Sequence, residues 1–251
     1  MKKYLKESRM ASCLRDLFFP PRCIACDDLL KPFSGNTEIF CPLCRTAWEA
    51  AVTEASDQAA RDAERGIVYL TFYRSGRTDG VPERVIYHLK HDGVPRAFRF
   101  VAERLAPRVL GAVQSLPGRL SADSDQGGDP VLFTYPPRRR KAVVQDGFDQ
   151  AARLAEALAE VCGGEFASLI RRGRRPVDEQ KQLDAQARRD NAARAYELSD
   201  TASERARGRI IVICDDLSTT GATLNRCADL LVEAGARLVI LATVERTLSD
   251  G

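Results

Sequence analysis

The sequence predicts an α/β protein in which a mostly parallel β-sheet is flanked by helices, with a small cysteine-rich element at the N-terminus. Short runs of apolar and β-branched residues alternate with segments whose apolar residues recur at helical spacing. This alternation favours parallel strands, because a helix carries the chain back to the start of the next strand. Two Cys-x-x-Cys pairs precede these segments. We therefore predict a zinc-ribbon-like element over residues 1–52 and an α/β domain over residues 65–251.

The predicted strands are short, apolar and bounded by turns or helices, and they cover residues 66–73, 131–135, 166–170, 210–214 and 237–244. The predicted helices have apolar residues three and four positions apart, and they cover residues 11–19, 82–92, 95–112, 147–161 and 222–234. Segments without an apolar face are predicted to be connections: a polar one over 53–65, a Gly/Ser/Asp-rich loop over 117–130 and a long basic excursion over 171–195.

Composition and charge narrow the class of protein. Apolar residues make up 44% of the chain and charged residues 29%, as in ordinary folded proteins. The net charge of +3 is too small to indicate a nucleic-acid partner by itself. No apolar run approaches the roughly 20 residues of a membrane span, and no apolar segment of a signal peptide follows the charged start at Met1. We therefore expect a cytoplasmic protein without a membrane span.

Residues 210–223 carry the strongest functional signal. An apolar run from Ile210 to Cys214 predicts a buried parallel strand, and Asp215 and Asp216 follow at its carboxyl end, where open α/β sheets bind ligands. The next residues are small or carry hydroxyls: Ser218, Thr219, Thr220, Gly221, Ala222 and Thr223. Backbone N–H groups of such a loop, and of the helix that it opens, favour a phosphate.

The two carboxylates cannot bind that phosphate, but they suit a vicinal diol or a Mg²⁺ ion. A ligand that carries a phosphate beside a diol would satisfy both halves of the motif. The alternative is a plain strand–turn–helix with a capping threonine.

The cysteine pairs predict a metal site. Cys23 and Cys26 are separated by fourteen residues from Cys41 and Cys44, a spacing that lets two thiolate knuckles close a tetrahedral Zn²⁺ site. The region has few apolar residues, so we expect a structural zinc ion to stabilise it. The alternatives are a redox pair and reduced cysteines without metal.

The Asp-Asp-x-x-Thr-Thr-Gly-Ala-Thr motif over residues 215–223 resembles the type I phosphoribosyltransferases and, more closely, the ComF family, which is associated with competence and DNA uptake in bacteria. The resemblance implies the type I phosphoribosyltransferase fold and binding of phosphoribosyl diphosphate (PRPP). Asp215 and Asp216 would hold the ribose hydroxyls together with Mg²⁺, and residues 218–223 would cradle the 5′-phosphate. The implied reaction displaces diphosphate at C1 of the ribose, and no motif indicates the acceptor. The ComF family also carries an N-terminal four-cysteine zinc element.

The resemblance extends to the basic run after the second predicted strand, Pro136-Pro137-Arg138-Arg139-Arg140-Lys141, which would face the diphosphate. Each of these cations could instead be solvated. Where the family reads Arg-Gly-Phe-Asn-Gln, this chain has acidic residues at Asp146 and Asp149, which lower the local preference for an anion. Residues 90–93 match the family's Lys-x-x-Gly turn.

The basic excursion also fits the family pattern, with these residues in order: Arg171, Arg172, Arg174, Arg175, Gln180, Leu183, Arg188 and Asn191. Phosphoribosyltransferases close a flexible loop over the site to exclude water. Gln180, Arg188 and Asn191 are therefore candidate lid residues, and the alternative is a solvated charged hairpin.

Two functions from different classes remain open. The chain could be a PRPP-dependent transferase linked to natural transformation. It could instead be a non-catalytic module that senses PRPP or a nucleotide, and that contacts single-stranded DNA or a helicase-like partner through its zinc element and basic segments. Few aromatic residues accompany the basic run, which weakens the case for a base-stacking platform.

Overall fold

The computed structural model describes residues 20–30, 38–74, 80–115, 130–173 and 195–247. Its main sheet has the strand order β1–β8–β7–β3–β4, β2 pairs with β8 beyond the end of β1, and every pairing is parallel. The strands are β1 (Ile67–Val68), β2 (Thr71–Tyr73), β3 (Leu132–Thr134), β4 (Glu165–Phe166), β7 (Ile210–Ser218) and β8 (Leu238–Thr247). The predicted α/β class and parallel sheet are confirmed.

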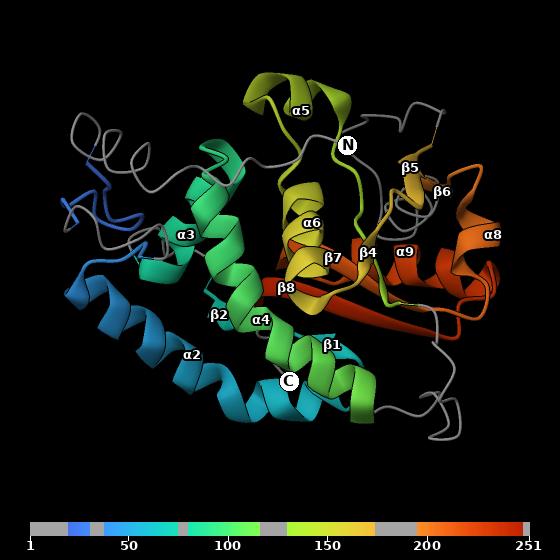
Figure 1. Ribbon diagram of the computed structural model, residues 1–251, viewed down its shortest axis with the longest axis horizontal. Coiled ribbons are helices and arrows are strands. Elements are labelled where there is room, and N and C mark those ends of the chain that lie inside the picture. The colour runs from blue at the N-terminus through green and yellow to red at the C-terminus, as the bar shows by residue number, and fades with distance from the viewer. Residues whose placement is uncertain (1–19, 31–37, 75–79, 116–129, 174–194, 248–251) are drawn as a thin grey trace, which may run out of the picture.

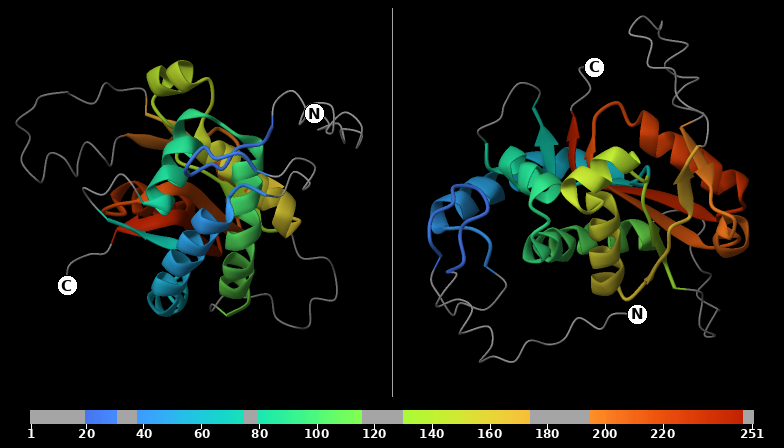
Figure 2. Two further views of the ribbon diagram at one scale, coloured as in Figure 1. Left: turned by 90° about the vertical axis from the view of Figure 1, so that its left-hand side faces the viewer. Right: turned by 90° about the horizontal axis from the view of Figure 1, so that it is seen from above.

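Helices cover both faces of this sheet (Figures 1 and 2). Their bounds are α2 (Pro42–Ala63), α3 (Val81–His91), α4 (Pro95–Ser115), α5 (Arg140–Asp146), α6 (Gln150–Cys162), α8 (Ala202–Ala206) and α9 (Ala222–Glu233). The side chains of Val212 and Cys214 pack with α4 and α6, whereas those of Ile211 and Ile213 pack with α8 and α9. Because successive side chains of a strand point to opposite faces, β7 needs an unbroken apolar run to be buried on both.

The N-terminal element packs onto the main core. Phe40 and Trp48 are buried at 1% exposure each, and both rings contact Phe100 of α4, with centroid distances of 5.2 Å and 6.0 Å. Arg84 of α3 also donates to the carbonyl oxygen of Ala25 at 2.6 Å. The few apolar residues of this element therefore extend the common core.

The prediction of a polar, solvated connection over residues 53–65 is wrong. These residues continue α2, which buries Ala55, Ala59 and Asp62 along one face against Tyr69. This face is built mainly from alanines, whose small side chains give only a weak helical pattern of apolar residues in the sequence. The division of the chain into residues 1–52 and 65–251 stays a prediction, and α2 continues past residue 52 to Ala63.

Two predicted strands are each divided in two. Residues 66–73 form β1 and β2, with Leu70 donating from its backbone to Val244 between them. Residues 166–170 end β4 and begin β5 (Ile170–Arg172), which pairs antiparallel with β6 (Tyr196–Leu198) in a separate small sheet. Within the described residues, no helix has the length and apolar character needed to cross a membrane.

Candidate functional site

The predicted ligand site lies at the carboxyl end of β7. The strand extends four residues beyond the predicted end at Cys214, because Leu217 and Ser218 continue the parallel ladder opposite Glu245 and Arg246 of β8. Asp215 pairs with Thr243 in the same ladder. The two acidic residues are therefore held by the sheet, which fixes their backbone more firmly than a loop would.

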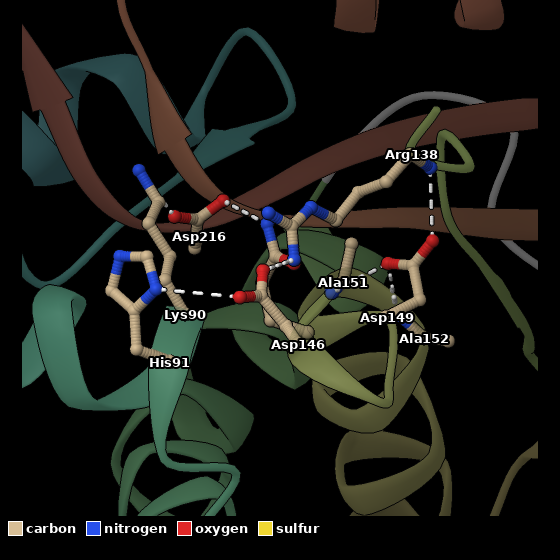
Figure 3. A network of polar contacts seen from close by, with 9 residues as sticks. Lys90, His91, Arg138, Asp146, Asp149, Ala151, Ala152 and Asp216 are labelled. Atoms are coloured by element: carbon tan, nitrogen blue, oxygen red, sulfur yellow. Dashed lines mark hydrogen bonds and ion pairs between the residues drawn. The ribbon is translucent and has the colours of Figure 1, made fainter. Parts of the chain in front are cut away.

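Asp216 is buried, and its two carboxylate oxygens face different partners (Figure 3). Oδ1 accepts a hydrogen bond from Gln150 Nε2 of α6 at 3.3 Å. Oδ2 forms an ion pair with Lys90 Nζ of α3 at 3.0 Å, where the Asp216 side chain is 7% exposed and that of Lys90 is 31% exposed. Oδ2 has no well-aligned hydrogen bond among the described residues. A buried carboxylate oxygen thus remains able to accept a hydrogen bond from a ligand.

Asp215 has a different environment. Its Oδ1 accepts a hydrogen bond from the backbone N–H of Asp216 at 2.9 Å. The residue keeps some exposed surface, but surrounding atoms enclose its carboxyl group, and this burial, together with the negative charge of Asp216, raises the pKa of Asp215 well above its ordinary value. Asp215 therefore holds a proton more readily than an ordinary aspartate does.

The predicted phosphate loop follows β7 directly. Thr219, Thr220 and Ala222 are exposed, and Gly221, with φ 71°, precedes the first residue of α9. The Thr220 hydroxyl accepts a hydrogen bond from Ala222 N at 3.4 Å. Ser218, by contrast, is buried as the last residue of β7. An accessible helix N-terminus therefore lies beside the two acids, as an anion site requires, and the phosphate-binding role of residues 218–223 stays a prediction.

Tyr196, which the sequence did not single out, lies on the other side of this loop. The Arg172 guanidinium is 4.8 Å from the centroid of its ring. Burial raises the pKa of the Tyr196 phenol, and the Arg172 charge acts against that rise. The Thr223 hydroxyl also favours its ionised form. The small β5–β6 sheet is thus in contact with the start of α9.

The basic run contains one partly buried arginine and three exposed cations. Arg138 follows the end of β3, and its guanidinium forms an ion pair with Asp146 at 2.8 Å. Arg139, Arg140 and Lys141 are exposed. The last two cations of the run lie in α5, which begins at Arg140 and which the sequence did not predict. Since β3 and β7 are parallel neighbours, their carboxyl ends lie at the same edge of the sheet, and the facing of these cations toward a diphosphate stays a prediction.

The two acidic departures from the family pattern both make structural contacts (Figure 3). Asp149 is the N-cap of α6, where its Oδ1 accepts from the N–H groups of Ala151 and Ala152 at 3.1 Å and 3.4 Å. Its Oδ2 accepts from the backbone N–H of Arg138 at 2.9 Å. Asp146 contacts His91 Nδ1 at 3.5 Å besides Arg138. These acids therefore hold the turn between β3 and α6 in place.

Glu245 of β8 is a further buried acid near the site, and sequence reasoning missed it. It is 0% exposed, and neither carboxylate oxygen has a well-aligned hydrogen-bond partner among the described residues. Burial raises the pKa of Glu245 to about 8, and the negative charges of Glu83 and Asp216 act in the same direction. Lys90 and the Thr71 hydroxyl oppose the rise. No signal pointed to Glu245, since a charged residue after an apolar run normally marks the end of a strand.

The four cysteines predicted as metal ligands come together. The sulfur atoms of Cys23, Cys26, Cys41 and Cys44 all lie within 4.8 Å of one another. Cys26 Sγ and Cys41 Sγ are 3.6 Å apart, close to the ~3.8 Å between thiolates on a tetrahedral Zn²⁺ with Zn–S bonds of about 2.3 Å. The cluster could therefore hold a zinc ion.

Backbone hydrogen bonds shape this metal centre. Asp27 N donates to the carbonyl of Cys23 at 2.9 Å and closes the first knuckle, and Ile24 N donates to Ile39 at 2.8 Å and ties it to the second. Without metal, burial raises the pKa of Cys26 to about 11. Binding of a metal ion at neutral pH would thus release thiol protons. The predicted lid residues Gln180, Arg188 and Asn191 lie outside the described residues.

Comparison with known proteins identifies a domain in the second half of the chain. Residues 144–250 match the family model of the phosphoribosyl transferase domain. No curated protein matches the chain. The likeness to solved structures is weaker, as three examples show. The allosteric regulatory enzyme of purine biosynthesis is 18% identical, with a TM-score of 0.34 over 58% of this chain and 25% of its own.

The glutamine PRPP amidotransferase from B. subtilis is also 18% identical, with a TM-score of 0.37 over 63% of this chain and 30% of its own. The protein TT1426 from Thermus thermophilus is 20% identical, with a TM-score of 0.31 over 62% of this chain and 84% of its own. The chain thus spans less than a third of the length of the first two structures. From residue 144 to residue 250, the chain contains a phosphoribosyl transferase domain.

Proposed function

We propose that the chain binds PRPP with Mg²⁺ and is a phosphoribosyltransferase-like protein of the ComF type, linked to DNA uptake. The observation that carries this proposal is the position of Asp215 and Asp216 in the last part of β7, directly before the exposed loop that opens α9. The match of residues 144–250 to the phosphoribosyl transferase domain supports it. The four-cysteine element before the domain agrees with the ComF type, and we propose that it holds a structural zinc ion.

In this proposal, each part of the ligand meets a different part of the site. Asp216 accepts a hydrogen bond from a ribose hydroxyl through Oδ2, which has no well-aligned donor among the described residues. The N-terminus of α9 and the hydroxyls of its loop hold the 5′-phosphate. Residues 136–141, which follow the carboxyl end of β3 at the same edge of the sheet as the end of β7, face the diphosphate. A Mg²⁺ ion, when bound, would neutralise charge on the departing diphosphate.

The experiment is a melting-temperature titration with PRPP and Mg²⁺, followed by calorimetry. The parent protein should be stabilised, because a ligand that binds only the native state raises the melting temperature. Asp216→Asn should abolish most of the shift, whereas Asp229→Asn, which changes an exposed acid on α9, should retain it. A parent protein that shows no shift at millimolar PRPP would rule out the proposed ligand.

Turnover is a separate question that the same proteins can answer. Diphosphate release in the presence of a panel of nucleobases would show transfer to an acceptor. Binding without release would favour the sensing role.

The exposure of α5 favours a second candidate function, contact with a polyanion such as single-stranded DNA. Helix α5 has no buried residue, Arg140 and Lys141 are exposed, and Val144 is 74% exposed. Figure 1 shows the helix projecting from the body of the molecule. Neutralising Arg140 and Lys141 should reduce the salt dependence of DNA binding by about one unit of slope per lost phosphate contact. An unchanged slope would exclude α5 as the contact surface.

A further inference from the structure

Lys90 lies outside the matched phosphoribosyl transferase domain, yet its ammonium group reaches the centre of the proposed site. It is in the last turn of α3, and its Nζ is 3.0 Å from Asp216 Oδ2. The turn after α3 is fixed against the domain, because Gly93 adopts φ +60° and packs directly on the ring of Phe148. The position of Lys90 is therefore set by contacts of the fold.

Lys90 interacts with more than one acidic side chain. Asp216 is its ion-pair partner, and Glu245 and Glu83 lie close enough to influence one another electrostatically. These carboxylates do not form a metal site of their own, since among the described residues only the four cysteines bring three or more ligand atoms within 4.8 Å of one another. Lys90 thus compensates part of the negative charge of these acids.

Lys90 also forms an ion pair with the carboxylate oxygen that a ligand would need. The Asp216 side chain is 7% exposed, whereas that of Lys90 is 31% exposed. A ribose hydroxyl that binds Oδ2 therefore competes with the ammonium group for this oxygen. A lysine can do this at low cost, because its charge sits at the end of a flexible four-carbon chain with three donors.

We propose that Lys90 is an anion-binding residue of this site, which moves from Asp216 to the diphosphate of PRPP when the ribose hydroxyls reach Asp216. The proposal rests on the proposed function, since it requires a phosphoribosyl ligand. The diphosphate is attached to the same ribose, so it comes within reach of an ammonium group displaced from the ribose-binding acid. Lys90 then compensates the ligand charge as it compensated Asp216 before.

The test compares two ligands that differ only in the diphosphate. PRPP with Mg²⁺ and ribose 5-phosphate are titrated by calorimetry into the parent protein, Lys90→Met and Lys90→Arg. Lys90→Met should weaken PRPP binding roughly ten-fold or more, while ribose 5-phosphate binds as well as before or more tightly. Lys90→Arg should recover most of the PRPP affinity. Arg99→Met is the matched control, because it removes a cation whose side chain is 61% exposed on α4, and both affinities should stay unchanged.

Each outcome is decisive. A parent protein that binds neither ligand would refute the proposed function, and this inference with it. A parent that binds both, with Lys90→Met reducing both affinities by the same factor, would refute the role of Lys90 alone and leave the site intact. Circular dichroism melting of each variant separates loss of binding from loss of fold, and Lys90→Arg supplies the second variant if Lys90→Met does not fold.

Discussion

The contacts of Asp149 give the most direct test of how the turn between β3 and α6 is built. Its carboxylate accepts three backbone hydrogen bonds, from Ala151 and Ala152 in the first turn of α6 and from Arg138 at the end of the basic segment. Asp149→Ala removes all three acceptors at once. Asp149→Asn introduces the residue that the ComF pattern has at this position and keeps a good N-cap, but its side chain offers one acceptor oxygen instead of two.

The magnitude follows from these contacts. Replacing an N-cap aspartate by alanine costs about 1 kcal/mol of stability. The Arg138 N–H loses a charged acceptor, which adds about 1 kcal/mol in a half-buried position where water replaces part of the bond. We therefore expect Asp149→Ala to lower the free energy of unfolding by about 2 kcal/mol. Asp149→Asn should cost about 1 kcal/mol, because the cap survives and the Arg138 contact is lost.

The assay is urea denaturation followed by circular dichroism, with the parent protein and both variants measured at one pH and with the slopes compared for equality. The critical result is that the free energy of unfolding falls in the order parent protein, Asp149→Asn, Asp149→Ala. A cost for Asp149→Ala below about 0.5 kcal/mol would show that the cap is not important for stability. Equal costs for Asn and Ala would refute the division between the cap and the Arg138 contact.

Glu245, Gly93 and Cys26 each give a further test. The pKa of Glu245 is about 8 in the native protein and ordinary in the unfolded chain. Between about pH 4.5 and pH 8, the native state therefore holds a proton that the unfolded state has lost. The free energy of unfolding should thus fall as the pH rises through this range. Glu245→Gln should remove roughly 1.4 kcal/mol per pH unit of this slope in urea unfolding, and an unchanged slope would contradict the burial argument. Gly93→Ala should lower the free energy of unfolding by about 2 kcal/mol, because a Cβ at φ +60° would lie 2.8 Å from the Phe148 ring. Gly147→Ala is the control: its φ is +79° but its Cβ would meet open space, so it should cost only about 1 kcal/mol. Equal costs for the two variants would exclude the ring contact. Elemental analysis should find about one zinc ion per chain, and Cys26→Ser should reduce that content and the melting temperature; a fully metal-free protein with an unchanged melting curve would refute the zinc site.

The features that the sequence predicted well are those in which local pattern and tertiary role agree. The run from Ile210 to Cys214 is apolar throughout because both of its faces are buried, and few other structures require that pattern. The cysteine spacing likewise predicts a cluster, and the sulfur atoms do converge. In both cases the chemistry needs particular residue types at neighbouring positions, so the signal is local.

The features that the sequence did not reveal depend on contacts between distant segments. Ala55 and Ala59 form a helix face only because Tyr69 lies against them, and alanine carries little apolar signal. Lys90 and Asp216 are far apart in the chain, and only the packing of α3 beside β7 makes them partners. Glu245 has the sequence appearance of a strand end, whereas the continuation of β8 to Thr247 buries it. No single-sequence pattern encodes such pairings.

The ion pairs of the site change what the acidic departures from the family pattern mean. Arg138 forms an ion pair with Asp146, and Asp216 forms one with Lys90. Under the proposed function, the ligand therefore has to exchange partners with both pairs. A pair that exchanges partners favours the ligand only if the new contacts are stronger than the old ones. In the proposed function, the only phosphate of ribose 5-phosphate binds at α9, so this ligand offers Arg138 no new partner, whereas the diphosphate of PRPP offers charge and several acceptor oxygens. Under the proposed function, the ion pair of Asp146 with Arg138 therefore lowers the affinity for ligands without a diphosphate, and the site favours PRPP over ribose 5-phosphate.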